Sequence, residues 1–281
     1  MQPNQHEANR WIVDKIIEWY QAHKRDLPWR HTQDPYLIWL SEVILQQTRV
    51  KQGLPYYQRF VEAYPTVDSL AAAPDEAVMR LWQGLGYYSR ARNMLATARY
   101  IVEQLGGEFP ARYADLLKLK GIGKYTAAAI ASFAFDEDVA VLDGNVYRVL
   151  ARIFGIEEDI ASPQAAKTFG SLAQALLPKG QAALYNQAMM EFGAVQCPPQ
   201  KPLCLYCPIQ QTCEAFRRSM QQELPVKKSK VKVRERFFYY AIFQSGEQIA
   251  LRKRTGKDIW EGLYDFYLYE TPTEASEEAV L

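Results

Sequence analysis

The sequence lacks a long apolar run, a strong net charge and cysteines over most of its length, and each absence narrows the possible classes of protein. No stretch approaches the length of a membrane span, and residues 1–29 mix charged and apolar side chains without an apolar core. We therefore expect neither a secretion signal nor a membrane anchor, and we expect a protein of the reducing cytosol. A net charge of +1 does not indicate a nucleic-acid binder, so any surface for nucleic acid must be local.

What is present is the composition of an ordinary globular protein, with 48% hydrophobic and 23% charged residues. A chain of 281 residues suits about two domains. Apolar residues recur at helical spacing as far as about residue 225, whereas residues 237–243 and 264–270 have the composition of β-strands. The sequence therefore predicts a mainly α fold followed by a short β-rich segment.

A glycine turn separates two helical patterns near the middle of the chain. Leu116 lies in the apolar run before it, Gly121 and Gly123 form the turn, and good helix formers follow from Tyr125. This is the form of a helix-hairpin-helix. Glycines let the backbone approach a phosphate, and the next helix start offers unpaired N–H groups to an anion. We interpret the hairpin as a grip on a DNA backbone that reads no base, with an ordinary glycine turn as the alternative.

One carboxylate follows the hairpin at the start of the next predicted helix. Asp143 precedes an apolar pattern that begins at Val146, while Arg148 and Arg152 lie on other faces of that helix. The helix dipole and nearby N–H groups favour the ionised form of Asp143, so we expect a carboxylate at neutral pH. The alternative is a plain helix cap.

A second acid lies in a more apolar setting. Glu42 shares a face with Trp39 and other apolar residues on a helix that we expect from Pro35 to about Val50. Burial on that face should raise the pKa of Glu42, so that it holds a proton near neutral pH. The alternative is a solvated glutamate on a helix surface.

All four cysteines fall within one short segment, as Cys197, Cys204, Cys207 and Cys213. Two disulfides could pair in three ways, but a cytosolic chain with no other cysteine favours a metal site. Zinc is one candidate for the metal at this site. Zinc sites with four cysteines usually show two C-x2-C pairs, however, and this segment has one.

The segments LKGIGKYTAAAI and VLDGNVYRVLAR resemble the helix-hairpin-helix-Gly/Pro-Asp DNA glycosylases and, within them, the adenine DNA glycosylases of the MutY type. Tyr125 stands where endonuclease III relatives carry the lysine that forms a Schiff base, which a tyrosine cannot form. The resemblance implies two helical lobes: residues 29–135, six helices with the hairpin, and residues 1–28 with 136–225, which carry an iron-sulfur loop. The cysteine spacing resembles the [4Fe-4S] loop of this superfamily, with the cluster in a structural role.

The resemblance also implies roles for individual residues. Glu42 matches the catalytic acid and Asp143 the carboxylate that stabilises an oxocarbenium ion, while Asn145 would orient Asp143 and Tyr125 would lie beside the sugar. The residues that it implies for base and DNA contacts are Arg25, Leu27, Trp29 and Arg30 in the base pocket, Gln47 and Thr48 in the duplex, Leu85 and Tyr87 inserted near the base, Gly121 and Gly123 on the backbone, and Gln187 on the base edge.

The activity that the resemblance implies is excision of adenine opposite 8-oxoguanine or guanine in double-stranded DNA, by a cytoplasmic monomer that leaves an abasic site. An endonuclease III-like glycosylase/lyase and a non-enzymatic iron-sulfur DNA-binding module are the alternatives. Residues 226–236 read as an exposed basic linker. Residues 237–281 resemble the start of a Nudix-like lesion-recognition domain, far short of a complete one, which indicates a truncated or abbreviated domain.

Overall fold

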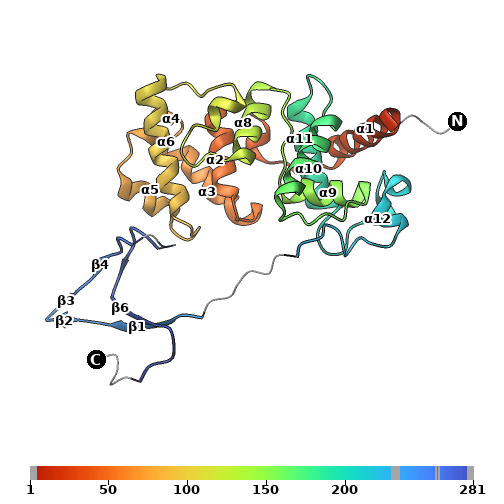
Figure 1. Ribbon diagram of the computed structural model, residues 1–281. Coiled ribbons are helices and arrows are strands. Elements are labelled where there is room, and N and C mark those ends of the chain that lie inside the picture. The colour runs from red at the N-terminus through yellow and green to blue at the C-terminus, as the bar shows by residue number, and fades with distance from the viewer. Residues whose placement is uncertain (1–4, 229–234, 257, 259, 277–281) are drawn as a thin grey trace.

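The mainly α fold is confirmed by a computed structural model, in which helices fill most of the chain as far as Arg217 (Figure 1). It describes residues 5–228, 235–256, 258 and 260–276. The helices are α1 (Gln5–His23), η1 (Pro28–Arg30), α2 (Pro35–Leu45), α3 (Val50–Ala63), α4 (Val67–Ala71), α5 (Asp75–Trp82), α6 (Ser89–Leu105), α7 (Tyr113–Leu116), α8 (Lys124–Phe135), α9 (Gly144–Phe154), α10 (Pro163–Leu176), α11 (Ala182–Glu191), η2 (Phe192–Gln196), η3 (Cys204–Tyr206), η4 (Gln210–Thr212) and α12 (Glu214–Arg217). None of the described helices is long and apolar enough to cross a bilayer.

Helices α2 to α8 enclose one hydrophobic core. Trp39 of α2 and Trp82 of α5 are almost fully buried in it, and Phe60 of α3 packs edge-on against Trp82 with ring centroids 5.9 Å apart. Helix α8 contributes small buried side chains in the run from Ala127 to Ala131, and it packs against α2. Small side chains let two helix backbones approach closely, so the start of α8 comes to lie beside the middle of α2.

A second core lies between α1 and helices α9 to α11, at the opposite end of the helical part in Figure 1. Phe169, Tyr185 and Phe192 fill its centre. The apolar pattern that predicts the helix after Asp143 faces this core, and its residues Val146, Val149, Leu150 and Ile153 are all buried.

Helix α2 is shorter than its apolar pattern predicts. It ends at Leu45 instead of near Val50, because the next residues leave the helical conformation: Gln47 has a left-handed backbone with φ +55°. The following helix begins at Val50. The segment between them is therefore a tight turn that exposes Gln47.

The predicted strands are confirmed in a small β-rich segment. Its elements are β1 (Phe237–Ala241), β2 (Gln244–Ser245), β3 (Gln248–Ile249), β4 (Arg252–Lys253), β5 (Tyr264–Asp265) and β6 (Tyr267–Thr271). Strands β1 and β6 pair antiparallel, and β2 to β5 form two short hairpin pairs. Arg92 of α6 donates a hydrogen bond of 2.5 Å to the carbonyl of Glu261 in this segment. Residues 229–234 of the predicted basic linker and residues 277–281 lie outside the described residues.

Candidate active site

The hairpin that joins α7 to α8 has the predicted form, and its two glycines serve different purposes. Gly121 has φ +77°, and a Cβ atom there would lie 2.8 Å from Cβ of Asn93, so both the turn and the packing against α6 require glycine. At Gly123 an added Cβ would meet nothing within 4 Å. The hydroxyl of Thr97 donates to the carbonyl of Lys120 at 2.6 Å and ties the hairpin to α6. The space at the start of α8 is therefore open to an approaching anion.

Glu42 of α2 lies in a small cavity between the two cores. Tyr125, in the first turn of α8, donates a hydrogen bond of 2.5 Å to Oε2 of Glu42. Burial and, to a smaller extent, the nearby charge of Asp143 raise the pKa of Glu42 to about 7, against the lowering effect of the Tyr125 hydrogen bond. With this raised pKa, Glu42 can hold a proton near neutral pH, as its position on the apolar helix face predicts.

The cavity around Glu42 has a volume of about 40 Å³, and several of the predicted pocket residues line it. Its lining consists of Trp29, Arg30, Ile38, Ser41, Glu42, Phe133, Gln187 and Met190. The structure therefore brings Trp29, Arg30 and Gln187 together with Glu42, although Gln187 is far from the other three in the sequence.

Arg25 and Leu27, which were also expected to line the base pocket, do not line the cavity around Glu42. Arg25 donates to Glu191 through its backbone N–H, Nε and Nη2, at 3.0, 2.8 and 2.7 Å. Arg30 reaches the same carboxylate at 2.6 Å, and these bonds hold the pKa of Glu191 at about 2 in spite of burial. The side chain of Leu27 is buried. Arg25 therefore fixes the loop in which Arg30 lies, instead of lining the cavity.

Asp143 lies at the N-terminus of α9 as predicted, and its side chain caps that helix. Its carboxylate accepts hydrogen bonds of 2.7 Å from the backbone N–H of Val146 and from Nδ2 of Asn145. Burial nevertheless raises the pKa of Asp143 above its ordinary value, whereas these two bonds and the charge of Arg148 lower it. The expected donors are present, but the net direction of the pKa shift is upward, because helix position alone does not account for desolvation.

Arg148 connects Asp143 to the cysteine segment, and sequence reasoning missed it. It donates to Oδ1 of Asn145 at 2.7 Å and to the carbonyl of Cys197 at 2.9 Å. Asn145 in turn holds Asp143, so one line of hydrogen bonds runs from the cysteine segment to the carboxylate. Arg152, one helical turn later, contacts the same segment through the carbonyls of Pro198 and Pro199. Both arginines are buried, so the faces of α9 that carry them, away from the apolar stripe as predicted, pack against the cysteine segment.

Two loops near the end of α2 carry the residues predicted to enter a duplex, and Arg90 joins them. Its guanidinium donates to the carbonyls of Val43 and Ile44 in the last turn of α2 and of Gln46 in the loop that follows, and to those of Leu85 and Gly86 on the other loop, at 2.6 to 3.3 Å. Sequence reasoning also missed Arg90. It lies in the first turn of α6, and the sequence does not show which carbonyls will surround its side chain.

Of the residues predicted to insert from these loops, Tyr87 and Gln47 project and Leu85 does not. Tyr87 is 53% exposed with φ +46°, and Gln47 is exposed with φ +55°. Leu85 is only 7% exposed and belongs to the first core, so its side chain is not available for DNA in this conformation. Thr48 is partly buried, and its hydroxyl donates to the carbonyl of Gln46 at 3.3 Å.

The four cysteines are free thiols, and together with Arg152 they line one small cavity of about 30 Å³. Within the described residues, no three His, Cys, Asp or Glu side chains are grouped to hold a single metal ion. A [4Fe-4S] cluster takes one thiolate on each iron, so its ligands surround a cavity without converging on a point. Arg152 also donates to Sγ of Cys197 at 3.2 Å, as suits an anionic group. The donor set therefore fits such a cluster.

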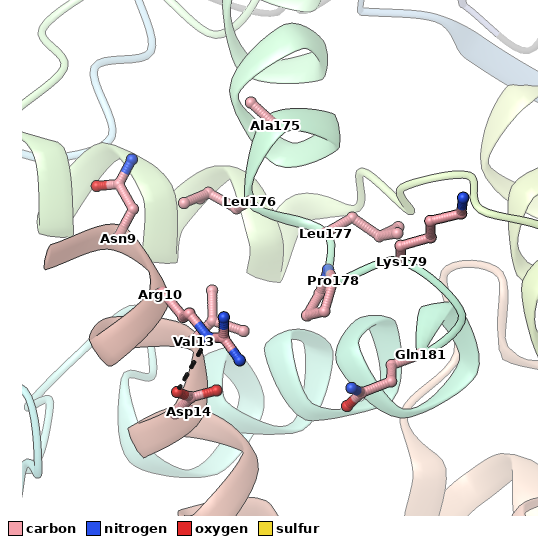
Figure 2. A pocket seen from close by; sticks show the side chains of 10 residues that line it. All are labelled: Asn9, Arg10, Val13, Asp14, Ala175, Leu176, Leu177, Pro178, Lys179 and Gln181. Atoms are coloured by element: carbon pink, nitrogen blue, oxygen red, sulfur yellow. Dashed lines mark ion pairs between the residues drawn. The ribbon is translucent and has the colours of Figure 1, made fainter. Parts of the chain in front are cut away.

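A larger pocket of about 360 Å³ lies between α1 and the segment that joins α10 to α11 (Figure 2). Arg10 and Asp14 form an ion pair of 4.0 Å on its α1 side, and Lys179 lies across from them. None of the predicted site residues lines it. The small cavity around Glu42 is lined by four of the predicted site residues, Trp29, Arg30, Glu42 and Gln187, and is therefore the better candidate for an active site.

Comparison with known proteins identifies the class. Residues 40–175 match HhH-GPD, the superfamily of base excision DNA repair proteins. The chain is also similar to a solved thermostable thymine-DNA glycosylase, with 30% identity and a TM-score of 0.70, over 75% of this chain and 98% of that one. The two-lobed helical fold with a helix-hairpin-helix is therefore that of the DNA glycosylases of this superfamily.

Curated relatives narrow the identification. The adenine DNA glycosylase of Mus musculus is 45% identical over 74% of this chain and 42% of its own length. That of Buchnera aphidicola subsp. Schizaphis graminum is 34% identical over 93% of this chain and 76% of its own length. The protein belongs to the adenine DNA glycosylase family. It spans about two fifths of the mouse relative and about three quarters of the Buchnera one.

Proposed function

We propose that the protein is a monofunctional adenine DNA glycosylase, which hydrolyses the N-glycosidic bond of adenine opposite 8-oxoguanine or guanine and leaves an abasic site. The observation that carries this proposal is the pair of carboxylates in unlike surroundings. Glu42 is buried with a pKa of about 7, whereas Asp143 accepts two hydrogen bonds and has the charge of Arg148 nearby. Groups of this kind divide the acid role and the charge-stabilising role between them.

In the proposed reaction, Glu42 gives its proton to N7 of an adenine turned out of the duplex. The electron pair of the glycosidic bond then leaves with the base, and positive charge develops on the sugar. Ionised Asp143 stabilises that charge, while Asn145 and Arg148 hold its carboxylate in place. Water adds to the sugar and loses a proton, which restores Glu42. An ionised Asp143 also favours the protonated form of Glu42, so the two roles support each other.

Tyr125 supports the monofunctional assignment. A lyase activity needs an amine that attacks the sugar, and the hydroxyl at this position donates to Glu42 instead. The proposed role of Tyr125 is therefore to hold the acid in place beside the sugar.

The proposed DNA contacts surround this centre. The hairpin at Gly121 and Gly123 would hold the backbone, and the exposed Gln47 and Tyr87 would enter the duplex. The four cysteines would hold a [4Fe-4S] cluster, which would supply a fixed framework for its loop. Arg148 and Arg152 would connect that framework to α9, because both contact carbonyls of the cysteine segment.

The test is base excision by the purified protein on duplexes with adenine opposite 8-oxoguanine, guanine or thymine, scored as abasic sites. Glu42→Gln and Asp143→Asn should each keep duplex binding but lower the single-turnover rate by ~10²-fold or more. Glu76→Gln, the same change at an exposed position of α5, is the matched control and should turn over normally. Normal rates in both active-site variants would refute the mechanism, and absence of adenine excision by the unaltered protein would refute the function.

A further inference from the structure

Tyr20, near the end of α1, lies behind the cavity and contacts one of the residues that line it. Its side chain is 3% exposed, and its hydroxyl donates a hydrogen bond of 2.7 Å to Oε1 of Gln187. The guanidinium of Arg30 lies over the same ring, 5.6 Å from its centroid. Tyr20 is therefore held firmly, although it does not itself line the cavity.

This contact decides which way the side-chain amide of Gln187 is turned. A phenol has one proton to donate, and the two ends of an amide differ, since the oxygen accepts and the nitrogen donates. Within the described residues, the hydroxyl of Tyr20 has Oε1 of Gln187 as its acceptor. A reversed amide would leave a buried hydroxyl proton without an acceptor, which is unfavourable. Oε1 is thus held toward Tyr20, and Nε2 is left to donate to a ligand.

Gln187 and Glu42 line the same cavity, so both would present hydrogen-bond donors to a bound base when Glu42 holds its proton. In adenine every ring nitrogen except the glycosidic one is an acceptor. In guanine one of these nitrogens, N1, carries a proton and would oppose a donor. A site whose buried donors match acceptors on the ligand rejects a ligand that lacks them.

We propose that Tyr20 is a positioning residue for base specificity: it fixes the amide of Gln187 so that Nε2 donates to a ring nitrogen of adenine. The inference deepens the proposed function and rests on it. Gln187 touches the base, whereas Tyr20 acts through Gln187. Glu191 lies one helical turn beyond Gln187 on α11 and holds Arg30 over the ring of Tyr20, which strengthens the arrangement.

The experiment combines enzyme variants with base analogues in single-turnover excision assays. The substrates carry adenine, 1-deaza-adenine or 3-deaza-adenine opposite 8-oxoguanine, and each analogue replaces one ring nitrogen by C–H. We expect Tyr20→Phe to slow excision of adenine by about 10-fold, the scale of one hydrogen bond. On the analogue that lacks the accepting nitrogen, the same substitution should slow excision by no more than about twofold. A purely structural role would slow all three substrates equally.

Variants at Gln187 keep the inference testable even if Tyr20→Phe fails to fold. Gln187→Glu still accepts from Tyr20 but has no N–H group, so it should lose selectivity among the three bases as Gln187→Ala does. Tyr20→Phe should add nothing in the Gln187→Ala background. Equal slowing on all three bases, or preserved selectivity in Gln187→Glu, would overturn the inference. Adenine excision by the unaltered protein separates these outcomes from a failure of the proposed function.

Discussion

Replacing Tyr125 by phenylalanine should move the alkaline limit of activity toward higher pH. The hydroxyl of Tyr125 donates to Oε2 of Glu42 at 2.5 Å, and of the effects that lower the pKa of Glu42 it is the largest. A donated hydrogen bond stabilises the ionised carboxylate, so its removal favours the protonated acid. The pKa of Glu42, raised to about 7 by burial, should then rise further.

The magnitude follows from the strength of that bond. Hydrogen bonds to charged groups contribute about 1.5 to 3 kcal/mol, and one pKa unit corresponds to about 1.4 kcal/mol, so the limit should move by roughly one to two pH units. The sign follows from the role of the group: a general acid is active while protonated, so excision falls as pH rises through its pKa. In the variant this fall should begin at a higher pH.

The measurement is kcat/KM for adenine excision between pH 5 and 10, because this ratio reports the free enzyme. Glu42→Gln is the control, since it removes the titrating group and should give a slow rate with no limb in this range. An alkaline limb that stays in place or moves to lower pH in Tyr125→Phe would refute the assignment of the limb to Glu42.

Three further outcomes test other parts of the structure. Between pH 4.5, the ordinary pKa of a glutamate, and about pH 7, Glu42 keeps a proton in the folded state that it has lost in the unfolded state. This difference lowers the free energy of unfolding by up to roughly 3 kcal/mol as pH rises through that range. The Tm of Glu42→Gln should therefore increase relative to that of the unaltered protein from pH 5 to pH 8. The purified protein should be brown and contain about four irons per chain, and stoichiometric zinc without iron would contradict the cluster. Borohydride should trap no covalent complex with DNA efficiently, because Tyr125 has no amine, and trapping as fast as base excision would favour the lyase.

Periodicity and turn residues were sufficient to predict the helical fold and the form of the hairpin, whereas the resemblance to the DNA glycosylases was needed to select the two candidate acids. The apolar pattern after Asp143 identified the buried face of α9, and the apolar face around Glu42 correctly gave the direction of its pKa shift. These features are local, so residues close in the sequence determine them. The end of α2 was misplaced because the left-handed backbone at Gln47 is set by its surroundings, not by a glycine or proline.

The contacts that hold the site are long-range, and no local pattern of residues indicates them. Glu191 reaches Arg25 and Arg30 across more than a hundred residues, and Arg148 connects Asn145 to Cys197. Long polar side chains on a helix are usually solvated, so a buried role for Arg148 becomes visible only when its carbonyl partners are placed. The upward pKa shift of Asp143 was missed for the same reason, since burial depends on the whole fold.

The position of Arg90 between the two projecting loops bears on the thermodynamics of encounter with DNA. One guanidinium binds carbonyls from both loops, so Gln47 and Tyr87 are ordered before any duplex arrives. The conformational entropy of these two loops is lost when the protein folds, so little more is lost when DNA binds. In Arg90 one terminal nitrogen bonds the end of α2 and the other bonds the second loop, and lysine has a single nitrogen. Calorimetry should therefore show a more unfavourable binding entropy in Arg90→Lys than in the unaltered protein.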